Sequence, residues 1–342
     1  MTRHSLPSGR LHPDRRSLLL GAAALLVGQR AVAASLGAGW GHVVDRARGF
    51  DQFRAIVVAH RGTTVLDEAL RGPGTDRPVN VKSVSKTVVA AVLGAALDRA
   101  VVPDVTATLA DVAPDLIPAA ADPRVRDITL ADLCTMQAGL ERTSGSNYGG
   151  WVASRNWVAN ALSRPVVAEP GSRMLYSTGS VHVLGAALAR ASGQSLLTMT
   201  RDWIGTPLGI EIPAWTRDPQ GFYLGGNEMA LSPRAMVRFA EMYRTGGAGI
   251  LSGDWVEASL RRRTRSPYSG LDYGYGWFLG RMQGTEVALA RGYGGQIIGI
   301  APALELSFAI TSDPTLPARS GGYFGDLLHL IDTGLLPAAA AA

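Results

Sequence analysis

Polar and apolar positions alternate near both ends of this chain, and the part between them follows helical periods. Residues 53–60 and 63–70 predict two strands joined through Arg61-Gly62, a short loop suited to a hairpin. Strand-like patterning returns after Tyr273 and ends in a short helix expected over about 322–332. The later strands are expected at 274–282, 286–290, 296–300 and 304–311.

The middle of the chain is mainly helix and loop. Residues 84–97 form an apolar, alanine-rich pattern that predicts a buried helix with Ser83 in its first turn. Ser232 and Pro233 are typical of an N-cap and a first helical position. Further helices are expected at 129–138, 179–192 and 232–245.

This order of elements predicts an α/β fold of the α+β kind. Strands at both ends of the chain would form one lobe, about 40–100 and 270–335, with a helical lobe inserted over about 101–265. We expect a single domain over 35–336, a disordered tail at 337–342, and a site where the two lobes meet.

The first 34 residues are typical of an export signal. Asp14-Arg15-Arg16-Ser17 is a twin-arginine start, an apolar stretch runs on to Val27, and Ala31-Val32-Ala33 suits a signal peptidase. The sequence therefore predicts export by the twin-arginine route to the periplasm or the medium. The alternative is an uncleaved membrane anchor, although the apolar stretch is short for a bilayer.

The net charge of +5 is concentrated in that segment. Residues 1–33 hold five arginines and one aspartate, so the remaining chain is close to neutral. A basic surface for nucleic acid is therefore not expected. After cleavage of the signal we also expect no stable membrane insertion.

The chain has 33 basic residues, and only Lys82 and Lys86 are lysines. Lysine can lose its proton when it is desolvated, whereas arginine stays charged near neutral pH. Lys86 follows Ser83 by three residues, and residues three apart share a helix face. A neutral amine in that position can act as general base for a serine nucleophile. Ser-x-x-Lys alone is a weak motif, because it also arises by chance.

Other chemistries find little support in the sequence. No spacing of His, Asp, Glu or Cys is typical of a metal site, and no cofactor motif is present. Cys134, the single cysteine, lies in an apolar helical pattern that favours core packing. Gly-x-Ser-x-Gly is absent, which excludes the nucleophile elbow of α/β-hydrolases.

Three segments in this order resemble the serine β-lactamase-like hydrolase family. They are Ser83-Val-Ser-Lys86, Tyr176-Ser177-Thr178 after a Pro-Gly turn, and Arg291-Gly-Tyr-Gly-Gly-Gln296. The resemblance covers about residues 40–335 and is strongest to the branch of esterases and 6-aminohexanoate-dimer hydrolases. It implies a β-lactamase/transpeptidase-like fold with an antiparallel sheet lobe and a helical lobe.

The resemblance also implies roles for particular residues. Ser83 would be the nucleophile, Lys86 its base, and Tyr176 the group that passes a proton to the leaving group. The backbone N–H groups of Ser83 and Gln296 would form the oxyanion hole.

Around these residues the sequence offers weaker candidates. The glycines of the third segment suggest that a side chain there would keep substrate from the backbone. The other candidates are Tyr148 and Trp151 for the acyl pocket or for loop anchoring, Asn227-Glu228 as a weaker pair, and Tyr293, Gly294 and Gly295 for substrate contact.

Two positions depart from the lactamase branch. Thr178 stands where that branch has asparagine, and Tyr293 where it has a lysine that holds the substrate carboxylate. The leading expectation is therefore an exported serine hydrolase that cleaves esters or small linear amides through an acyl-enzyme. The alternatives are a β-lactamase or DD-peptidase, and a penicillin- or peptide-binding module without turnover.

Overall fold

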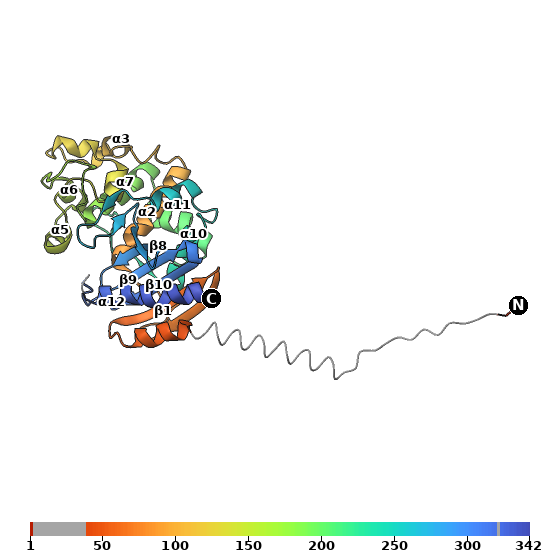
Figure 1. Cartoon of the computed structure of the whole chain (residues 1–342). Helices are drawn as coiled ribbons and strands as arrows, with labels where there is room; N and C mark the ends of the chain where they lie inside the picture. The colour runs from red at the N-terminus through yellow and green to blue at the C-terminus, as the bar shows by residue number, and fades with distance from the viewer. Residues whose placement is uncertain (3–38, 320–321) are drawn as a thin grey trace.

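The structure is a computed structural model that describes residues 1–2, 39–319 and 322–342 (Figure 1). The export signal expected over 1–34 lies, apart from the first two residues, outside the described part. No helix among the described residues has the length and apolar character needed to cross a membrane.

An eight-stranded antiparallel sheet forms one lobe, with the strand order β2-β1-β10-β9-β8-β7-β6-β5. β1 pairs with β10, so strands from the two ends of the chain lie side by side, which confirms the predicted lobe. The strands are β1 Phe53–His60, β2 Thr63–Ala69, β5 Thr264–Arg265, β6 Asp272–Tyr273, β7 Phe278–Met282, β8 Thr285–Gly292, β9 Gln296–Ala301 and β10 Leu306–Ser312.

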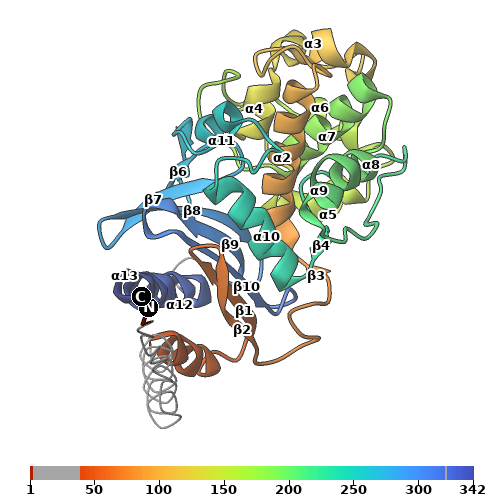
Figure 2. The same ribbon diagram turned by 90° about the vertical axis from the view of Figure 1, so that its right-hand side faces the viewer.

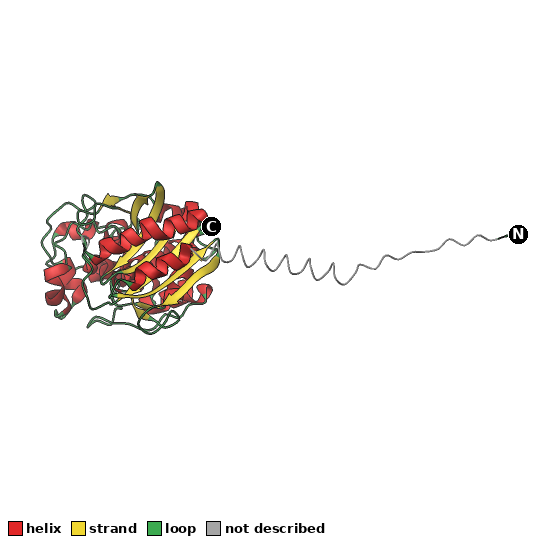
Figure 3. Ribbon diagram, turned by 60° about the horizontal axis from the view of Figure 1, so that its bottom comes forward, coloured by secondary structure: helices red, strands yellow, loops and turns green. Residues whose placement is uncertain are grey.

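Helices form the second lobe and cover the sheet (Figures 1 and 2). α10 packs against β1, β9 and β10, and the C-terminal helices lie on the opposite face with the helix over 39–48 (Figures 2 and 3). The helices are α2 Ser85–Asp98, α3 Leu109–Val112, α4 Leu130–Cys134, α5 Tyr148–Val152, α6 Trp157–Leu162, α7 Thr178–Ser192, α8 Leu196–Thr200, α9 Thr206–Leu208, α10 Pro233–Arg244, α11 Gly253–Ser259, α12 Tyr323–Leu330 and α13 Leu336–Ala341.

α2 runs between the lobes and is buried from Ser85 to Ala96. Its alanines and glycine allow neighbouring elements to approach closely on all sides. Trp255 of α11 lies against Gly94, where a Cβ would come within 2.2 Å of the indole ring. The alanine-rich pattern therefore predicted a central helix correctly.

Two elements are shorter than the sequence predicts because the chain turns within them. Met136 (φ 64°) and Gly139 (φ 75°) have left-handed backbone, so the helix predicted at 129–138 ends at Cys134. Gly276 (φ 82°) lies in a turn, so the strand predicted at 274–282 begins only at Phe278. Its carbonyl accepts a hydrogen bond from Thr87 of α2, which fastens this end of the sheet to the helix.

The prediction of a disordered tail at 337–342 is wrong. Residues up to Ala341 belong to α13, where Leu336 and Ala339 are buried. Alanine has the highest helix propensity, and this segment continues the chain of α12 with its apolar side turned inward. Ala338 lies against Gly39 of the N-terminal helix.

The fit of Trp255 against Gly94 yields a stability prediction. Gly94→Ala places a methyl group against a rigid ring and should lower the free energy of unfolding by about 1–3 kcal/mol. The measurement is urea unfolding followed by fluorescence.

Gly149→Ala is the matched control, since Gly149 lies exposed in α5 with nothing within 4 Å of an added Cβ. It should be neutral or stabilise by up to about 1 kcal/mol. Equal midpoints for Gly94→Ala and the unchanged protein would show that α11 moves away freely, against this account of the packing.

Candidate active site

Ser83 lies where the chain enters α2, in the short 3₁₀ turn Lys82–Val84. Lys82 directly before it has a left-handed backbone (φ 52°), which is costly for a residue with a side chain. Asn80 Oδ1 accepts the Lys82 N–H at 2.9 Å and stabilises this conformation. The turn therefore presents Ser83 at the start of a fixed helix.

Ser85 supports the same turn from within. Its buried hydroxyl donates to the Lys82 carbonyl at 2.6 Å and accepts from the Met229 N–H at 3.2 Å. Ser85 therefore points away from the cavity and belongs to the scaffold of the turn.

Lys86 is 2% exposed, and its amine lies 3.0 Å from Ser83 Oγ. The amine also donates to the carbonyl of Gly226 at 2.5 Å and lies 3.3 Å from Thr178 Oγ1. Burial lowers the pKa of Lys86 to about 7, and no described carboxylate forms an ion pair with it. Near neutral pH the amine is therefore uncharged in a large fraction of molecules and can accept the Ser83 proton.

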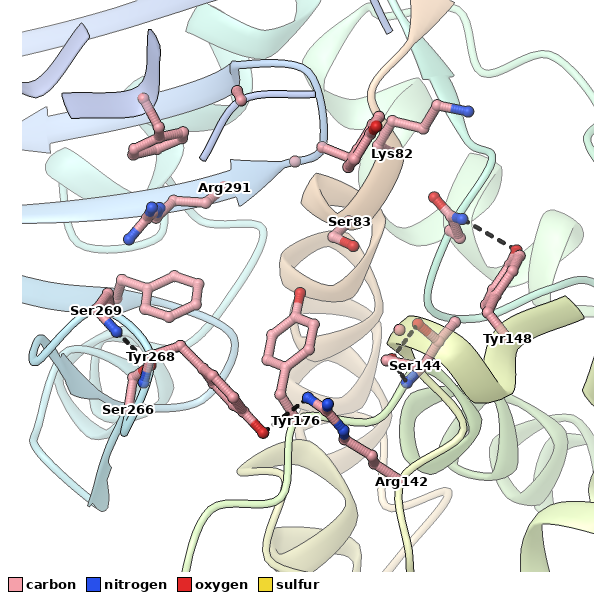
Figure 4. A pocket seen from close by; sticks show the side chains of 18 of the residues that line it. Lys82, Ser83, Arg142, Ser144, Tyr148, Tyr176, Ser266, Tyr268, Ser269 and Arg291 are labelled. Atoms are coloured by element: carbon pink, nitrogen blue, oxygen red, sulfur yellow. Dashed lines mark hydrogen bonds between the residues drawn. The ribbon is translucent and has the colours of Figure 1, made fainter. Parts of the chain in front are cut away.

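Tyr176 completes the group. Its hydroxyl points toward Ser83, and its ring lies 5.0 Å from the Lys86 amine (Figure 4). Burial raises the pKa of Tyr176, and proximity to Ser83 opposes that shift in part. The phenol therefore keeps its proton at neutral pH and can donate it. The structure thus brings the three residues predicted as catalytic to one point.

Ser83 and Tyr176 line a cavity of about 630 Å³ between the lobes (Figure 4). The lining combines serines, aromatic rings and three cationic side chains. Its residues are Lys82, Ser83, Arg142, Ser144, Gly145, Tyr148, Tyr176, Thr178, Asn227, Glu228, Ser266, Tyr268, Ser269, Phe278, Arg291, Gly292, Tyr293, Pro314, Ala318 and Phe324.

The hairpin between β8 and β9 differs from the expectation. Gly292 and the half-exposed Tyr293 line the cavity, whereas Gln296 does not. The Gln296 side chain is fully buried and exchanges two hydrogen bonds with the backbone of Ser312. The hairpin therefore reaches the cavity through Gly292 and Tyr293.

The two following glycines, Gly294 and Gly295, are not part of the cavity lining. A Cβ on Gly294 would meet the Asp313 carbonyl at 2.3 Å, and one on Gly295 would meet Tyr323 at 2.7 Å. Both residues have positive φ. Close packing under the hairpin and the tight turn therefore require glycine here, so the expected substrate contact is wrong for both.

Tyr148 and Trp151 separate into two roles. Tyr148 lines the cavity, and its hydroxyl accepts a hydrogen bond from Asn227 at 3.1 Å. Trp151 is fully buried and donates its indole N–H to the Trp157 carbonyl. Of the two alternatives for Trp151, the pocket role is wrong and loop anchoring agrees with the structure, because the ring packs against Tyr148 and is absent from the cavity lining.

The segment around Asn227-Glu228 was only a weak candidate in the sequence, yet it supports the site from the side opposite the β8–β9 hairpin. The Glu228 carboxylate accepts hydrogen bonds from Asn80 at 2.6 Å and from Lys82 at 3.1 Å. Gly226 holds the Lys86 amine through its carbonyl, and a Cβ there would meet the Thr178 carbonyl at 2.9 Å. No local motif could reveal this contact, since it joins positions about 140 residues apart.

The sequence also gave no indication that Arg142 and Tyr268 line the cavity. The Arg142 guanidinium donates to the Tyr268 hydroxyl at 2.8 Å across the cavity (Figure 4). They come from different lobes and carry no sequence pattern of their own. Within the described parts of the chain, no three His, Cys, Asp or Glu side chains gather as metal ligands would.

His182 and Cys134 are not part of the cavity lining. His182 is fully buried and pairs with Asp218 at 3.0 Å. Cys134 is buried in the core, where burial raises the pKa of its thiol.

The sequence profile of the Beta-lactamase family matches residues 50–324. The chain therefore belongs to the Beta-lactamase family, which places it among serine hydrolases. A comparison with curated protein sequences gave no match.

Several solved structures share the fold. A Bacillus anthracis protein described as a 6-aminohexanoate-dimer hydrolase is 18% identical, with TM-score 0.71 over 84% of this chain and 79% of that one. EstCE1, a hydrolase with promiscuous acyltransferase activity, is 18% identical, with TM-score 0.70 over 90% and 99%. A penicillin-binding protein homologue from Caulobacter crescentus is 16% identical, with TM-score 0.68 over 88% and 98%.

The lowered pKa of Lys86 predicts how reactive Ser83 is at each pH. The amine gains a proton as the pH falls below about 7 and can then no longer act as a base. The rate of labelling by a fluorophosphonate probe should be level above about pH 8. It should approach a tenfold loss per pH unit well below 7.

Lys86→Arg is the control, because a guanidinium keeps the charge and cannot accept a proton. It should label at least about 100-fold more slowly at pH 8, where the Lys86 amine of the unchanged protein is neutral. A rate that is constant between pH 5.5 and 8, or normal labelling of Lys86→Arg, would show that Lys86 is not the base.

Proposed function

We propose that this chain is an exported serine hydrolase that cleaves esters or small linear amides through an acyl-enzyme. The observation that carries the proposal is the buried Lys86 amine, 3.0 Å from Ser83 Oγ and with a pKa of about 7. A structural lysine gains nothing from desolvation, whereas a general base requires it.

Acylation starts with proton transfer from Ser83 to the neutral Lys86 amine as Oγ attacks the substrate carbonyl. The developing oxyanion is stabilised by backbone N–H groups. Ser83 supplies one of them, and we assign the other to the Gly292–Tyr293 backbone in place of Gln296, because Gly292 and Tyr293 line the cavity and Gln296 does not. The partial positive charge at the start of α2 adds to this stabilisation.

Collapse of the tetrahedral intermediate breaks the bond to the leaving group. Tyr176 donates its proton to the departing oxygen or nitrogen and regains one from the protonated Lys86, whose amine lies against its ring. Water then attacks the acyl-enzyme as the neutral Lys86 amine takes its proton, and that proton passes to Ser83 Oγ when the acyl bond breaks. The products are a carboxylic acid and an alcohol or amine.

Export and location remain part of the proposal. They rest on the twin-arginine start, the apolar stretch and the small residues at 31–33. The enzyme would act in the periplasm or outside the cell on small molecules.

The first prediction separates the two serines of the motif. Ser83→Ala should abolish hydrolysis of p-nitrophenyl butyrate and leave thermal unfolding unchanged, since Ser83 faces the cavity. Ser85→Ala should keep measurable turnover and lower the melting temperature, because it leaves the buried Met229 N–H without its partner and removes one of the hydrogen bonds to the Lys82 carbonyl.

The two readouts are steady-state rates and differential scanning fluorimetry on the same preparations. If Ser85→Ala is inactive with unchanged stability and Ser83→Ala remains active, Ser85 is the nucleophile.

The second prediction concerns β-lactams, whose carboxylate lies close to the scissile amide. Tyr293 replaces the lysine that the lactamase branch uses there, and the Arg291 guanidinium points away from Ser83 (Figure 4). A lost charge-assisted hydrogen bond costs about 1.5–3 kcal/mol, roughly 10- to 150-fold. We therefore expect kcat/KM for p-nitrophenyl butyrate to exceed that for nitrocefin by at least about tenfold.

If nitrocefin is the better substrate by that factor, the protein acts as a β-lactamase. A stable penicillin adduct without turnover of either compound would instead indicate a binding module.

A further inference from the structure

Exposed apolar side chains gather around the mouth of the catalytic cavity. Tyr268 and Tyr293 line the cavity, and each is 53% exposed. Leu316 is 44% exposed and lies between the lining residues Pro314 and Ala318. Single exposed apolar residues are ordinary on a protein surface, whereas a group of them around one opening is typical of an interaction site. We call Tyr268, Tyr293 and Leu316 the mouth residues.

The three mouth residues come from separate connections of the sheet lobe. Tyr268 lies between β5 and β6, Tyr293 between β8 and β9, and Leu316 between β10 and α12. Folding therefore brings them to one opening from distant parts of the chain. Because a large part of each side chain remains in solvent, core packing does not account for these residue types.

Two arginines near the mouth residues have only uncharged partners. Arg142 donates to the Tyr268 hydroxyl at 2.8 Å across the cavity (Figure 4). The exposed Arg265 of β5 donates to the Gly270 carbonyl at 2.9 Å. In the parts of the chain that the structure describes, neither arginine forms an ion pair.

The acids in this region are already neutralised. Glu228, the one carboxylate of the lining, pairs with Lys82 at 3.1 Å. Asp313, which directly follows β10, pairs with Arg54 at 2.6 Å. The surface around the mouth therefore keeps an excess of positive charge and attracts an anionic partner.

Tyrosines and arginines in this combination indicate a lipid surface. Tyrosine is enriched at the level of lipid headgroups, where its ring meets apolar carbons and its hydroxyl meets water. Arginines beside such rings are attracted by the negative surface of an anionic bilayer. A protein seated on the mouth residues would cover the entrance to Ser83, whereas a bilayer would supply substrate to it.

We propose that the mouth of the cavity docks on a membrane surface rich in anionic phospholipid and takes its substrate from that surface. The contact is peripheral, because it uses side chains of three turns. The substrates are esters with an acyl chain long enough to partition into the bilayer. The substrate class rests on the proposed hydrolase function, whereas the docking itself does not.

The first test reads the contact at single positions of the full chain. Leu316→Cys is labelled with an environment-sensitive fluorophore. Cys134, the only native cysteine, is 2% exposed and burial raises the pKa of its thiol, so it stays unlabelled. Vesicles of phosphatidylglycerol should shift the emission of the Leu316 label to shorter wavelength, at a lipid concentration at least about tenfold lower than vesicles of phosphatidylcholine.

Val167→Cys carries the control label, because Val167 is also exposed but is not part of the cavity lining. Its emission should not change. Since each label reports its own surroundings, lipid binding through another part of the chain does not imitate the result. Equal shifts at both positions, or none at Leu316, would overturn the proposal. A shift that grows with protein concentration without lipid would assign the surface to a second copy and would also overturn it.

Arg265→Gln tests the charge contribution in the Leu316-labelled protein. It should raise the phosphatidylglycerol concentration for the half-maximal shift about fivefold, the effect of one basic side chain at such a surface. Arg238→Gln is the matched control, because Arg238 is an exposed arginine that also donates to a glycine carbonyl, that of Gly209. Equal concentrations for the two variants would overturn the assignment of an anionic surface.

The last test concerns the substrate. We compare 4-methylumbelliferyl oleate in phosphatidylglycerol vesicles with 4-methylumbelliferyl butyrate in solution. Leu316→Asp should lower kcat/KM for the vesicle-borne ester about tenfold and leave the soluble ester unchanged, since Leu316 does not line the cavity. Val167→Asp should change neither rate. An equal loss on both esters, or no loss on the vesicle-borne one, would overturn the lipid-borne substrate.

The docking surface and the proposed hydrolase fail separately. A shift confined to the Leu316 label, without hydrolysis of either ester, would support docking and refute the hydrolase. Hydrolysis of both esters without any shift would keep the hydrolase and overturn docking.

Discussion

Burial of the Lys86 amine beside Ser83 is the interaction on which the active-site arrangement depends. In water a lysine is charged at neutral pH and cannot accept a proton, so its chemistry here comes from desolvation. The fold provides this by placing α2 between the two lobes, where nearly every side chain of the helix is covered. The hydrogen bonds from the amine to Gly226 and Thr178 orient it without supplying the negative charge that would restore its proton.

The segment from Gly226 to Leu231 connects this chemistry to the scaffold. It contributes the Gly226 carbonyl to Lys86, the Glu228 carboxylate to Asn80 and Lys82, and the strand pairing of β3 (Val79–Asn80) with β4 (Ala230–Leu231). These contacts stabilise the strained backbone at Lys82. A strained backbone of this kind persists only where the surrounding structure stabilises it. Here the stabilised backbone at Lys82 fixes the position of the nucleophile.

The sequence predicted the parts that local patterns encode. The central helix, the lobe built from both ends of the chain, the Ser232 N-cap and the meeting of Ser83, Lys86 and Tyr176 all follow from periodicity, motif spacing and family resemblance. Tertiary contacts determined the rest. Gln296 and Trp151 carry suggestive residue types, yet packing turns both inward, and the cavity residues Arg142, Tyr268 and Phe324 meet only after folding. The helix at the C-terminus was predicted as a disordered tail, because a short run of alanines does not reveal in the sequence which surface it packs against.

The most direct test of the account is titration of the Lys86 amine itself. The chain has only two lysines, so a protein labelled with [13Cε]lysine gives two signals, and the one absent from Lys86→Met identifies Lys86. The account predicts that this signal titrates with a midpoint at about pH 7. A midpoint above about pH 9.5, in the range of a lysine in water, would show that the amine is charged at neutral pH and would contradict its role as base.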